Sequence, residues 1–502
     1  MSWKDQGVRR ASWSAGVRAA LLALALLSGC AVGPDFHRPE APPVQGYTRA
    51  PLAPKTASAD VRGGEEQTFV PGLEISHQWW TLFESPALSA LVDRALQASP
   101  TVTAAQAALR QATELVAAQE GTFYPSLQAG FTPGYQKASA NLSPPLNSNL
   151  LRYGLYTAQL SVAFTPDVWG GNRRAVESLQ GAAEAQRFLL EAALVTLTTN
   201  LVSAAVQEAS LRAQIAATRE ILAISTKSLD LLKAQLAAGA VTGLDVAAQE
   251  AALAQQEQTL PPLQKQLEQN RDLLMALLGG FPGEPTGETF DLASLHLPQE
   301  LPLSLPSKLV EQRPDVRAAE AQLHAACAQI GVAVAKRLPQ FTIGGGYGGT
   351  STHFSQMFDP GATFWSIVGS ATQTLFDGGT LLHQQRAAEA AFDQAAALYR
   401  GTVITGFQNV ADTLVALHAD AESLKAAVAS ERAARRTLEI TRKQQQAGQV
   451  NFLALLSAQQ AYQQALITRV QAQAGRLVDT AALFQALGGG WWNRPPPAPQ
   501  KD

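Results

Sequence analysis

Apolar residues recur along residues 170–238 at alternating intervals of three and four positions. The series consists of Leu194, Leu197, Leu201, Ala204, Leu211, Ile215, Leu222, Leu229, Leu232 and Leu236. Only Glu208, Thr218 and Ser225 interrupt it. This spacing predicts one long helix with a coiled-coil seam, because it keeps a single apolar face turned toward a partner helix. Such a helix would be about 100 Å long. A globule of this chain length has a radius of gyration of only about 23 Å, so we expect a rod or a tube.

The chain contains two repeats, separated by roughly 210 residues. A helix over Leu88–Gln119, bent at Pro100, corresponds to a helix over Leu309–Arg337. Each ends at a proline that opens a strand, and each strand region leads to a long helix. The second long helix has its own seam, formed by Phe407, Val410, Leu414, Leu417, Ala421, Leu424 and Val428. The repeats are predicted to cover residues 76–283 and 307–490, with a Pro-rich linker over residues 284–306.

Each long helix is predicted to turn back on a shorter one as a coiled-coil hairpin. The turns lie at Gly239 and Gly448, because glycine adopts the left-handed conformation that ends a helix. The returning helices are expected over Leu244–Leu278 and Phe452–Leu487. Residues 491–502, which include several prolines, are predicted to form a disordered tail.

Four strands with alternating apolar and polar residues are predicted between the short and long helices. The apolar series are Leu127, Ala129 and Phe131; Ala158, Leu160, Val162 and Phe164; Phe341, Ile343 and Tyr347; Trp365 and Ile367. Alternation over about ten residues fits transmembrane β-strands, although a half-buried soluble sheet would show the same pattern. The exported N-terminus and the very long helices favour the membrane interpretation.

Four strands cannot close a membrane barrel by themselves, because unpaired strand edges are not tolerated in hydrocarbon. The chain must therefore associate with other copies. An eight-stranded barrel is filled by its own side chains, so a conduit requires at least a trimer.

The first 29 residues resemble a secretory signal peptide, with Arg9, Arg10 and Arg18 before an apolar run too short to span a bilayer. Leu27-Ser28-Gly29-Cys30 resembles the bacterial lipobox, in which the cysteine carries N-acyl and S-diacylglycerol chains. Ala31 in place of aspartate favours, by the same resemblance, sorting to the outer membrane. Residues 30–75 lack periodicity and are rich in Pro, Ala and Gly, which predicts a lipidated, extended segment along a more ordered body.

The composition offers no sign of catalysis or of nucleic-acid binding. The net charge is −3 and 16% of the residues are charged, without a basic patch. The seven histidines do not occur at metal-ligand spacing. Gly344, Gly346 and Gly349 have the spacing of a dinucleotide motif, but loop-forming residues follow where a helix should open. We therefore predict no catalytic residue, no metal and no cofactor other than the covalent lipid.

The chain resembles the outer membrane factor family, the TolC-like and OprM-like exit ducts, in its NodT-type lipoprotein branch. The stretches that carry the resemblance are residues 32–39 and 78–83, Thr165–Gly170, Arg313–Arg317, Leu375–Gly379 and Ala486–Trp491. The resemblance implies a mainly α fold with a membrane β-barrel. It implies a homotrimer with a twelve-stranded β-barrel in the outer membrane and a twelve-helix α-barrel in the periplasm. It also implies a periplasmic adaptor and an inner-membrane RND-type pump as partners.

By the same resemblance, side chains near the hairpin turns close the periplasmic end, and a twist of the hairpins opens it. The candidates are Asp245, Leu455, Leu456 and Ser457. Ala454 and Ser457 stand where the family often has aspartates, so an apolar plug of Leu455 and Leu456 is an alternative to an acidic ring. Ordinary packing within the hairpin remains open for each residue.

The sequence leaves three functional hypotheses. The first is a passive exit duct for small molecules in a tripartite efflux system. The second is a duct that serves a type I protein-secretion system. The third is a lipid-anchored periplasmic coiled-coil adaptor, which two repeats with amphipathic strands disfavour.

Overall fold

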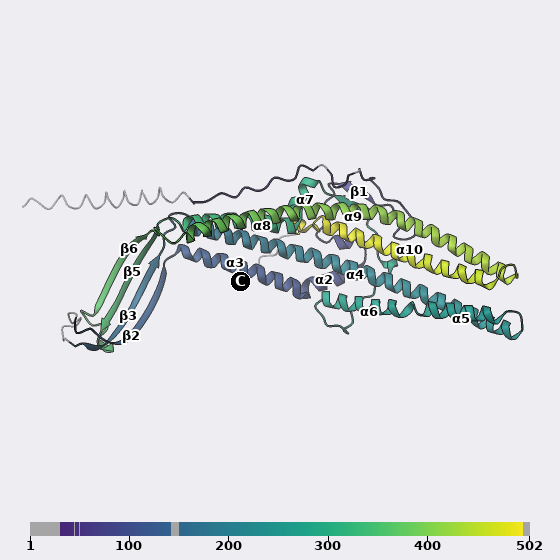
Figure 1. The fold of residues 1–502 in the computed structure, drawn as a ribbon, viewed down its shortest axis with the longest axis horizontal. Coiled ribbons are helices and arrows are strands. Elements are labelled where there is room, and N and C mark those ends of the chain that lie inside the picture. The colour runs from purple at the N-terminus through teal and green to yellow at the C-terminus, as the bar shows by residue number, and fades with distance from the viewer. Residues whose placement is uncertain (1–30, 45, 50, 142–149, 495–502) are drawn as a thin grey trace, which may run out of the picture. The chain divides into compact units, whose positions relative to one another are not determined.

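The computed structural model describes residues 31–44, 46–49, 51–141 and 150–494 (Figure 1). Cys30 and the predicted signal segment lie outside this range. Contacts divide the chain into two compact units. The sheet unit contains residues 31–38, 109–185 and 319–399, and the helical unit contains residues 39–108, 186–318 and 400–494, apart from the positions outside the described range. Each unit therefore combines segments of both predicted repeats.

The short helices of both repeats break at a proline. α2 (Pro86–Ala98) is followed by α3 (Pro100–Glu120), and α7 (Pro306–Gln312) by α8 (Pro314–Ala335). The residues before the two prolines, Ser99 and Arg313, are extended, as expected because proline disfavours helical geometry in its predecessor. The predicted bend at Pro100 is thus a break, and the second repeat has the same break.

The two long helices have equal lengths of 67 residues: α4 (Gly171–Ala237) and α9 (Thr380–Gln446). Gly239 and Gly448 follow them with the same φ of +71°, so both predicted glycine turns are confirmed. α10 (Phe452–Ala486) returns as predicted. The other returning helix is not continuous but consists of α5 (Gly243–Glu257) and α6 (Leu260–Leu277), because two prolines occupy the first turn of α6.

The predicted seams are the faces on which the long helices are buried. In α4, Leu201 and Leu211 are almost completely buried, and in α9 the same holds for Val410, Leu414 and Leu417. The polar residues that interrupt the first seam, Glu208, Thr218 and Ser225, are equally buried. These three residues therefore lie on the same buried face of α4 as the apolar residues, although their side chains are polar. Leu236, at the end of α4, is exposed.

Four antiparallel strands form the sheet of the sheet unit: β2 (Ser126–Lys137), β3 (Arg152–Phe164), β5 (Gln340–Ser351) and β6 (Thr363–Thr372). Their order is β2-β3-β5-β6, so strands of the two repeats meet at the β3–β5 pair (Figure 1). The helical unit contains a second, parallel pair, β1 (Thr68–Pro71) with β4 (Glu300–Leu303). This pair lies in segments that we expected to be an extended arm and a linker.

Part of the predicted disordered tail is ordered. Trp491–Asn493 form a short 3-10 helix, and the Trp491 indole donates a hydrogen bond to the Gln312 carbonyl at 2.6 Å. The Trp491 ring also meets the edge of Phe188, with the ring centroids 5.5 Å apart. The prediction of disorder is wrong for residues 491–494, and residues 495–502 lie outside the described range.

The buried carboxylate of Glu208 allows a test of whether apolar packing along the first seam stabilises the protein. Glu208 lies 3.6 Å from Arg271 of α6, and its burial raises the pKa of the carboxyl group. We expect Glu208→Leu to stabilise the protein by about 1 kcal/mol, because leucine completes the apolar seam and Arg271 keeps Glu268 as an ion-pair partner. Thermal unfolding followed by circular dichroism measures this change.

Leu211→Ala is the matched control on the same face of α4. It should destabilise the protein by about 2–5 kcal/mol through loss of buried volume. If Glu208→Leu lowered the melting temperature as Leu211→Ala does, the Glu208–Arg271 contact would be a net stabilising interaction and our interpretation of the seam would be wrong.

Candidate functional site

One face of the four-stranded sheet is apolar and uncovered. The strand register places Ala129, Leu160, Tyr347 and Trp365 in one row across all four strands. Tyr347 and Trp365 are 58% and 73% exposed. Further exposed apolar residues on this face include Leu127, Phe131, Tyr135, Val162, Ile343 and Ile367. The predicted alternation is therefore confirmed as a continuous apolar surface, which monomeric soluble proteins rarely expose.

The opposite face of the sheet is mainly polar and carries small residues. Hydroxyl pairs link neighbouring strands, with Thr157 3.0 Å from Thr350 and Thr342 2.6 Å from Ser370. Phe364 and Val368 of β6 are exceptions to the pattern on this face. The strands contain 10 to 13 residues, and tilted strands of about 9–11 residues cross a bilayer. The sheet thus has the two faces and the length of a membrane-barrel wall.

An aspartate caps the start of each long helix immediately after the sheet. Asp167 accepts hydrogen bonds from the backbone N–H groups of Asn172 and Arg173, both at 2.9 Å. Asp377 accepts them from Leu381 at 2.8 Å and Gly379 at 2.9 Å. These hydrogen bonds, chiefly the one from the Leu381 N–H, lower the pKa of Asp377 and keep its carboxyl group ionised. Two of the stretches that carry the family resemblance, Thr165–Gly170 and Leu375–Gly379, therefore connect a strand to the long helix that follows it.

The third motif, Arg313-Pro314-Asp315, joins three helices of the helical unit. The Arg313 guanidinium donates to both Asp315 carboxylate oxygens, at 3.0 and 2.6 Å, and to the Ala486 carbonyl at the end of α10 at 2.8 Å. Gly406 of α9 passes so close that an added Cβ would lie 3.1 Å from Arg313 Nε. The motif is a structural clamp, and nothing in its geometry indicates catalysis.

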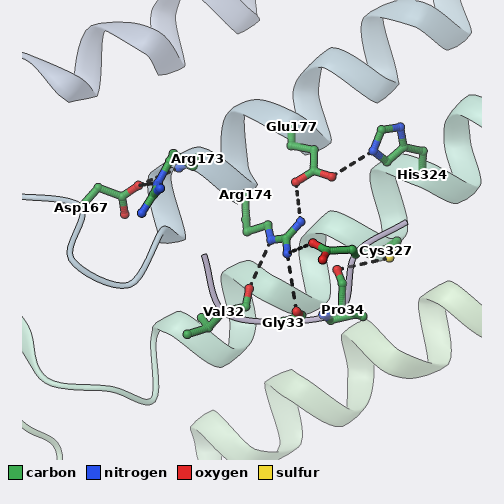
Figure 2. A network of polar contacts seen from close by, with 10 residues as sticks. Val32, Gly33, Pro34, Asp167, Arg173, Arg174, Glu177, His324 and Cys327 are labelled. Carbon is green, nitrogen blue, oxygen red and sulfur yellow. Dashed lines mark hydrogen bonds and ion pairs between the residues drawn. The ribbon is translucent and has the colours of Figure 1, made fainter. Parts of the chain in front are cut away.

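The first described residues form a strap, Val32–Arg38, that is bound by α4 and α8 (Figure 2). Arg174 of α4 is its anchor: the guanidinium donates to the Val32 carbonyl at 3.2 Å and to Asp35 at 2.6 Å. The hydrogen bond from Arg174, together with its charge, lowers the pKa of Asp35. Glu177 holds Arg174 from the other side at 2.8 Å. The strap is therefore fixed by charge-assisted hydrogen bonds.

Packing fixes the same strap from the side of α8. Phe36 stacks on His324 with ring centroids 4.5 Å apart, and Arg38 pairs with Glu320 at 3.0 Å. Gly33 lies directly on Gly331, where a side chain at either position would collide with backbone. This close approach was not visible in the sequence, although Gly33 belongs to the stretch that resembles efflux lipoproteins.

Ala31, the residue after Cys30, lies against Gly170 at the start of α4. The Val32 N–H donates to the Trp169 carbonyl at 3.0 Å, so the strap begins beside the segment that follows β3. The Trp169 indole in turn donates to the Pro339 carbonyl at 2.7 Å, immediately before β5. The start of the strap is therefore placed at the end of the sheet where the strands meet the helices.

At the first hairpin turn, Asp245 completes a capping box. Its carboxylate accepts hydrogen bonds from the Thr242 N–H at 3.0 Å and the Thr242 hydroxyl at 2.7 Å. These two bonds lower the pKa of Asp245. The spacing of Thr242 and Asp245 is the sequence signal of such a box.

At the second hairpin turn, Leu455 and Leu456 are buried in a cluster with Val246 and Phe452. Their burial favours ordinary hairpin packing over an apolar plug. Ser457, by contrast, is exposed. The structure thus brings Leu455 and Leu456 together, engages the Asp245 carboxylate in the capping box and leaves Ser457 exposed. Within the described residues, no group of three or more His, Cys, Asp or Glu side chains could hold a metal ion.

Comparison with known proteins identifies the class. The family model described as outer membrane efflux protein matches residues 91–280 and 305–489, and the chain belongs to this family. The outer membrane protein OprJ of Pseudomonas aeruginosa is 30% identical over 95% of this chain and 96% of its own. The pyoverdine export outer membrane protein OpmQ of Pseudomonas putida is 28% identical over 88% of this chain and 94% of its own.

Solved structures of outer membrane channels have the same fold as this chain. The outer-membrane channel OprN superposes with a TM-score of 0.81 at 27% identity, covering 92% of this chain and all of that one. The open state of the MtrE outer membrane channel of Neisseria gonorrhoeae has the same fold, with a TM-score of 0.78 over 92% of this chain and 98% of that one, at 22% identity. These findings confirm the predicted fold class and outer-membrane location. Membership in a family of channels also confirms that the chain is not an enzyme.

The capping box allows a gate role of Asp245 to be separated from a structural one. Thr242→Ala and Asp245→Ala should each destabilise the first hairpin by about 1 kcal/mol, because each removes half of the same box. Asp245→Asn should in addition weaken the cation preference of the channel in planar bilayers if the carboxylate faces the lumen. Equal ion selectivity of the wild type and Asp245→Asn would assign Asp245 to the cap alone.

Proposed function

We propose that three copies of this chain form a passive outer-membrane exit duct in a tripartite efflux system. The observation that carries this proposal is the four-stranded sheet, with one exposed apolar face and two open edges. Within the described residues, β2 and β6 have no partner on their outer sides. In hydrocarbon, each unpaired backbone group would cost several kcal/mol, so the edges must pair with strands of other chains. Three chains supply twelve strands, enough to surround an open lumen.

The internal repeat supports a specific geometry for the contact between chains. Within one chain, the segment after β3 meets the segment before β5 through the hydrogen bond from Trp169 to Pro339. In a closed ring, β6 pairs antiparallel with β2 of the next chain. The segment after β6 then meets the segment before that β2. Leu375 and Phe376 after β6 are 93% and 91% exposed, and Tyr124 before β2 is 75% exposed. Contact between these residues would remove exposed apolar surface at the subunit boundary.

A cysteine pair tests this contact. We expect Tyr124→Cys combined with Phe376→Cys to form a disulfide between chains, so that covalently linked trimers appear on a denaturing, non-reducing gel. Tyr124→Cys with Phe354→Cys is the control, because Phe354 packs on Phe131 and Tyr156, away from the start of β2. Light scattering in detergent reports the oligomeric state independently. A monomer without channel conductance in planar bilayers would contradict the duct itself, whereas an unlinked trimer would contradict only the contact.

We further propose that Cys30 carries the membrane anchor. The strap supports this, because it fixes Ala31 beside Gly170 at the end of the sheet. Acyl chains on the preceding residue would then enter the bilayer next to the barrel. Burial of acyl chains contributes roughly 0.8 kcal/mol per CH₂ group, so a multiply acylated cysteine is a firm anchor.

Two substitutions separate acylation from docking of the strap. Cys30→Ser should abolish incorporation of labelled palmitate, and persistence of the label would refute the assignment. Arg174→Ala should leave the label unchanged but expose the strap, because it removes the bonds to Val32 and Asp35. Limited proteolysis near residues 32–38 measures that exposure. Arg173→Ala, on the neighbouring residue, is the control that keeps the strap protected.

The partners that we propose are a periplasmic adaptor and an inner-membrane pump of the RND type. The family match and the relatives named for efflux and export favour this system over type I protein secretion. We place the gate at the hairpin turns around Gly239 and Gly448, where the two hairpins end. Copurification of the trimer with a pump and adaptor encoded beside it tests the assignment, and capture of a secretion ATPase instead would overturn it.

A further inference from the structure

The helical unit contains a pair of acidic residues that none of the functions above uses. Asp420 belongs to α9 and Asp479 to α10, the two helices of the second hairpin. Gly475 and Asp479 are four residues apart and therefore lie on one face of α10. An added Cβ at Gly475 would lie 3.7 Å from Asp420 Oδ2. This face of α10, including Asp479, is thus turned toward the Asp420 carboxyl group.

The nearest cation is already engaged elsewhere. Arg476 of α10 is fully buried and donates hydrogen bonds to the segment before β1, with its acceptors Thr56 Oγ1 at 2.9 Å, Gln67 Oε1 at 3.2 Å and the Gly63 carbonyl at 3.5 Å. Glu65 of the same segment also acts on Arg476 electrostatically. His418, two residues before Asp420 on α9, packs its ring on Phe69 of β1 instead, with the ring centroids 5.2 Å apart.

The acidic pair therefore lacks a full counter-charge. Within the described residues, no hydrogen-bond donor reaches the buried Asp420 Oδ2. Burial is the main cause that raises the pKa of Asp420 to about 7, and Asp479 adds to the increase. The charge of Arg476 acts in the opposite direction. Two carboxyl groups that share a partly buried site cannot both be charged at low cost. A proton on one of them supplies the donor that the site otherwise lacks.

We propose that Asp420 and Asp479 share one proton across the α9–α10 interface and act as a pH-sensitive lock on the second hairpin. With the proton present, one carboxyl group donates a hydrogen bond to the other and ties the helices together. When the proton leaves to water, two negative charges face each other in a site whose arginine is committed to another segment. The hydrogen bond between the two carboxyl groups is then lost, and the two charges repel each other.

The direction of the pH dependence follows from the raised pKa. The packed helices bind the proton more tightly than the separated helices, in which the pKa of Asp420 returns toward 3.8. The stabilisation is complete below about pH 4 and is lost progressively as the pH rises to about 7. Because one proton is involved, the constant for local opening should increase about tenfold per pH unit over this range and level off above it. Acid therefore tightens the hairpin that ends at Gly448.

Hydrogen exchange on the full-length trimer in detergent tests the lock. Protection factors of amides near Asp420 and Asp479, corrected for the intrinsic pH dependence of exchange, should fall by between tenfold and a hundredfold from pH 5 to pH 8. Asp420→Asn should abolish this fall, because its amide donates to Asp479 at every pH. Asp412→Asn removes an exposed carboxylate on the same helix and is the matched control that keeps the fall.

An unchanged pH dependence in Asp420→Asn would overturn the proposal. Infrared difference spectroscopy gives an independent readout, since a protonated carboxyl group has its own C=O band. We expect that band in the wild type at pH 5 and 6, its loss in either Asp420→Asn or Asp479→Asn, and its retention in Asp412→Asn. A band that persists in both single variants, or one absent from the wild type, would likewise refute the shared proton.

Discussion

Backbone hydrogen bonds that a single chain cannot complete govern the architecture. The sheet ends at β2 and β6, and hydrocarbon offers no substitute for the missing partners. An apolar face on one side and hydroxyl-bearing residues on the other define which surface meets lipid and which meets water. In the trimer that we propose, the membrane domain is complete only when neighbouring chains supply the missing strands.

The joints between strand and helix show how repeated sequence produces repeated geometry. Asp167 and Asp377 both accept backbone hydrogen bonds at the start of a long helix, although the donors lie at different distances along the chain. Gly239 and Gly448 end those helices with the same left-handed conformation. Both kinds of residue act locally at the ends of the two long helices, which have the same length of 67 residues.

The sequence predicts these local features well, because heptad spacing, helix-ending glycines and strand alternation can each be recognised within a short stretch of residues. It does not predict contacts between distant segments. The β1–β4 pair and the Trp491–Gln312 hydrogen bond each join residues that are far apart in the chain, and no periodicity marks them. The Arg174 anchor was missed for the same reason, since its acceptors lie more than a hundred positions away. At Asp245 the sequence also contains a local signal, because Thr242 and Asp245 have the spacing of a capping box.

The two compact units each draw on three separated stretches of chain, taken from both repeats. A nascent chain that has emerged only as far as the linker possesses one complete repeat but neither complete unit. Its strands β2 and β3 still lack β5, and its first seam lacks the helices of the second repeat. The duplicated halves are therefore not duplicated domains. The sheet unit is complete only once residue 399 has been made, and until then β2 and β3 present an unpaired edge that is prone to aggregation.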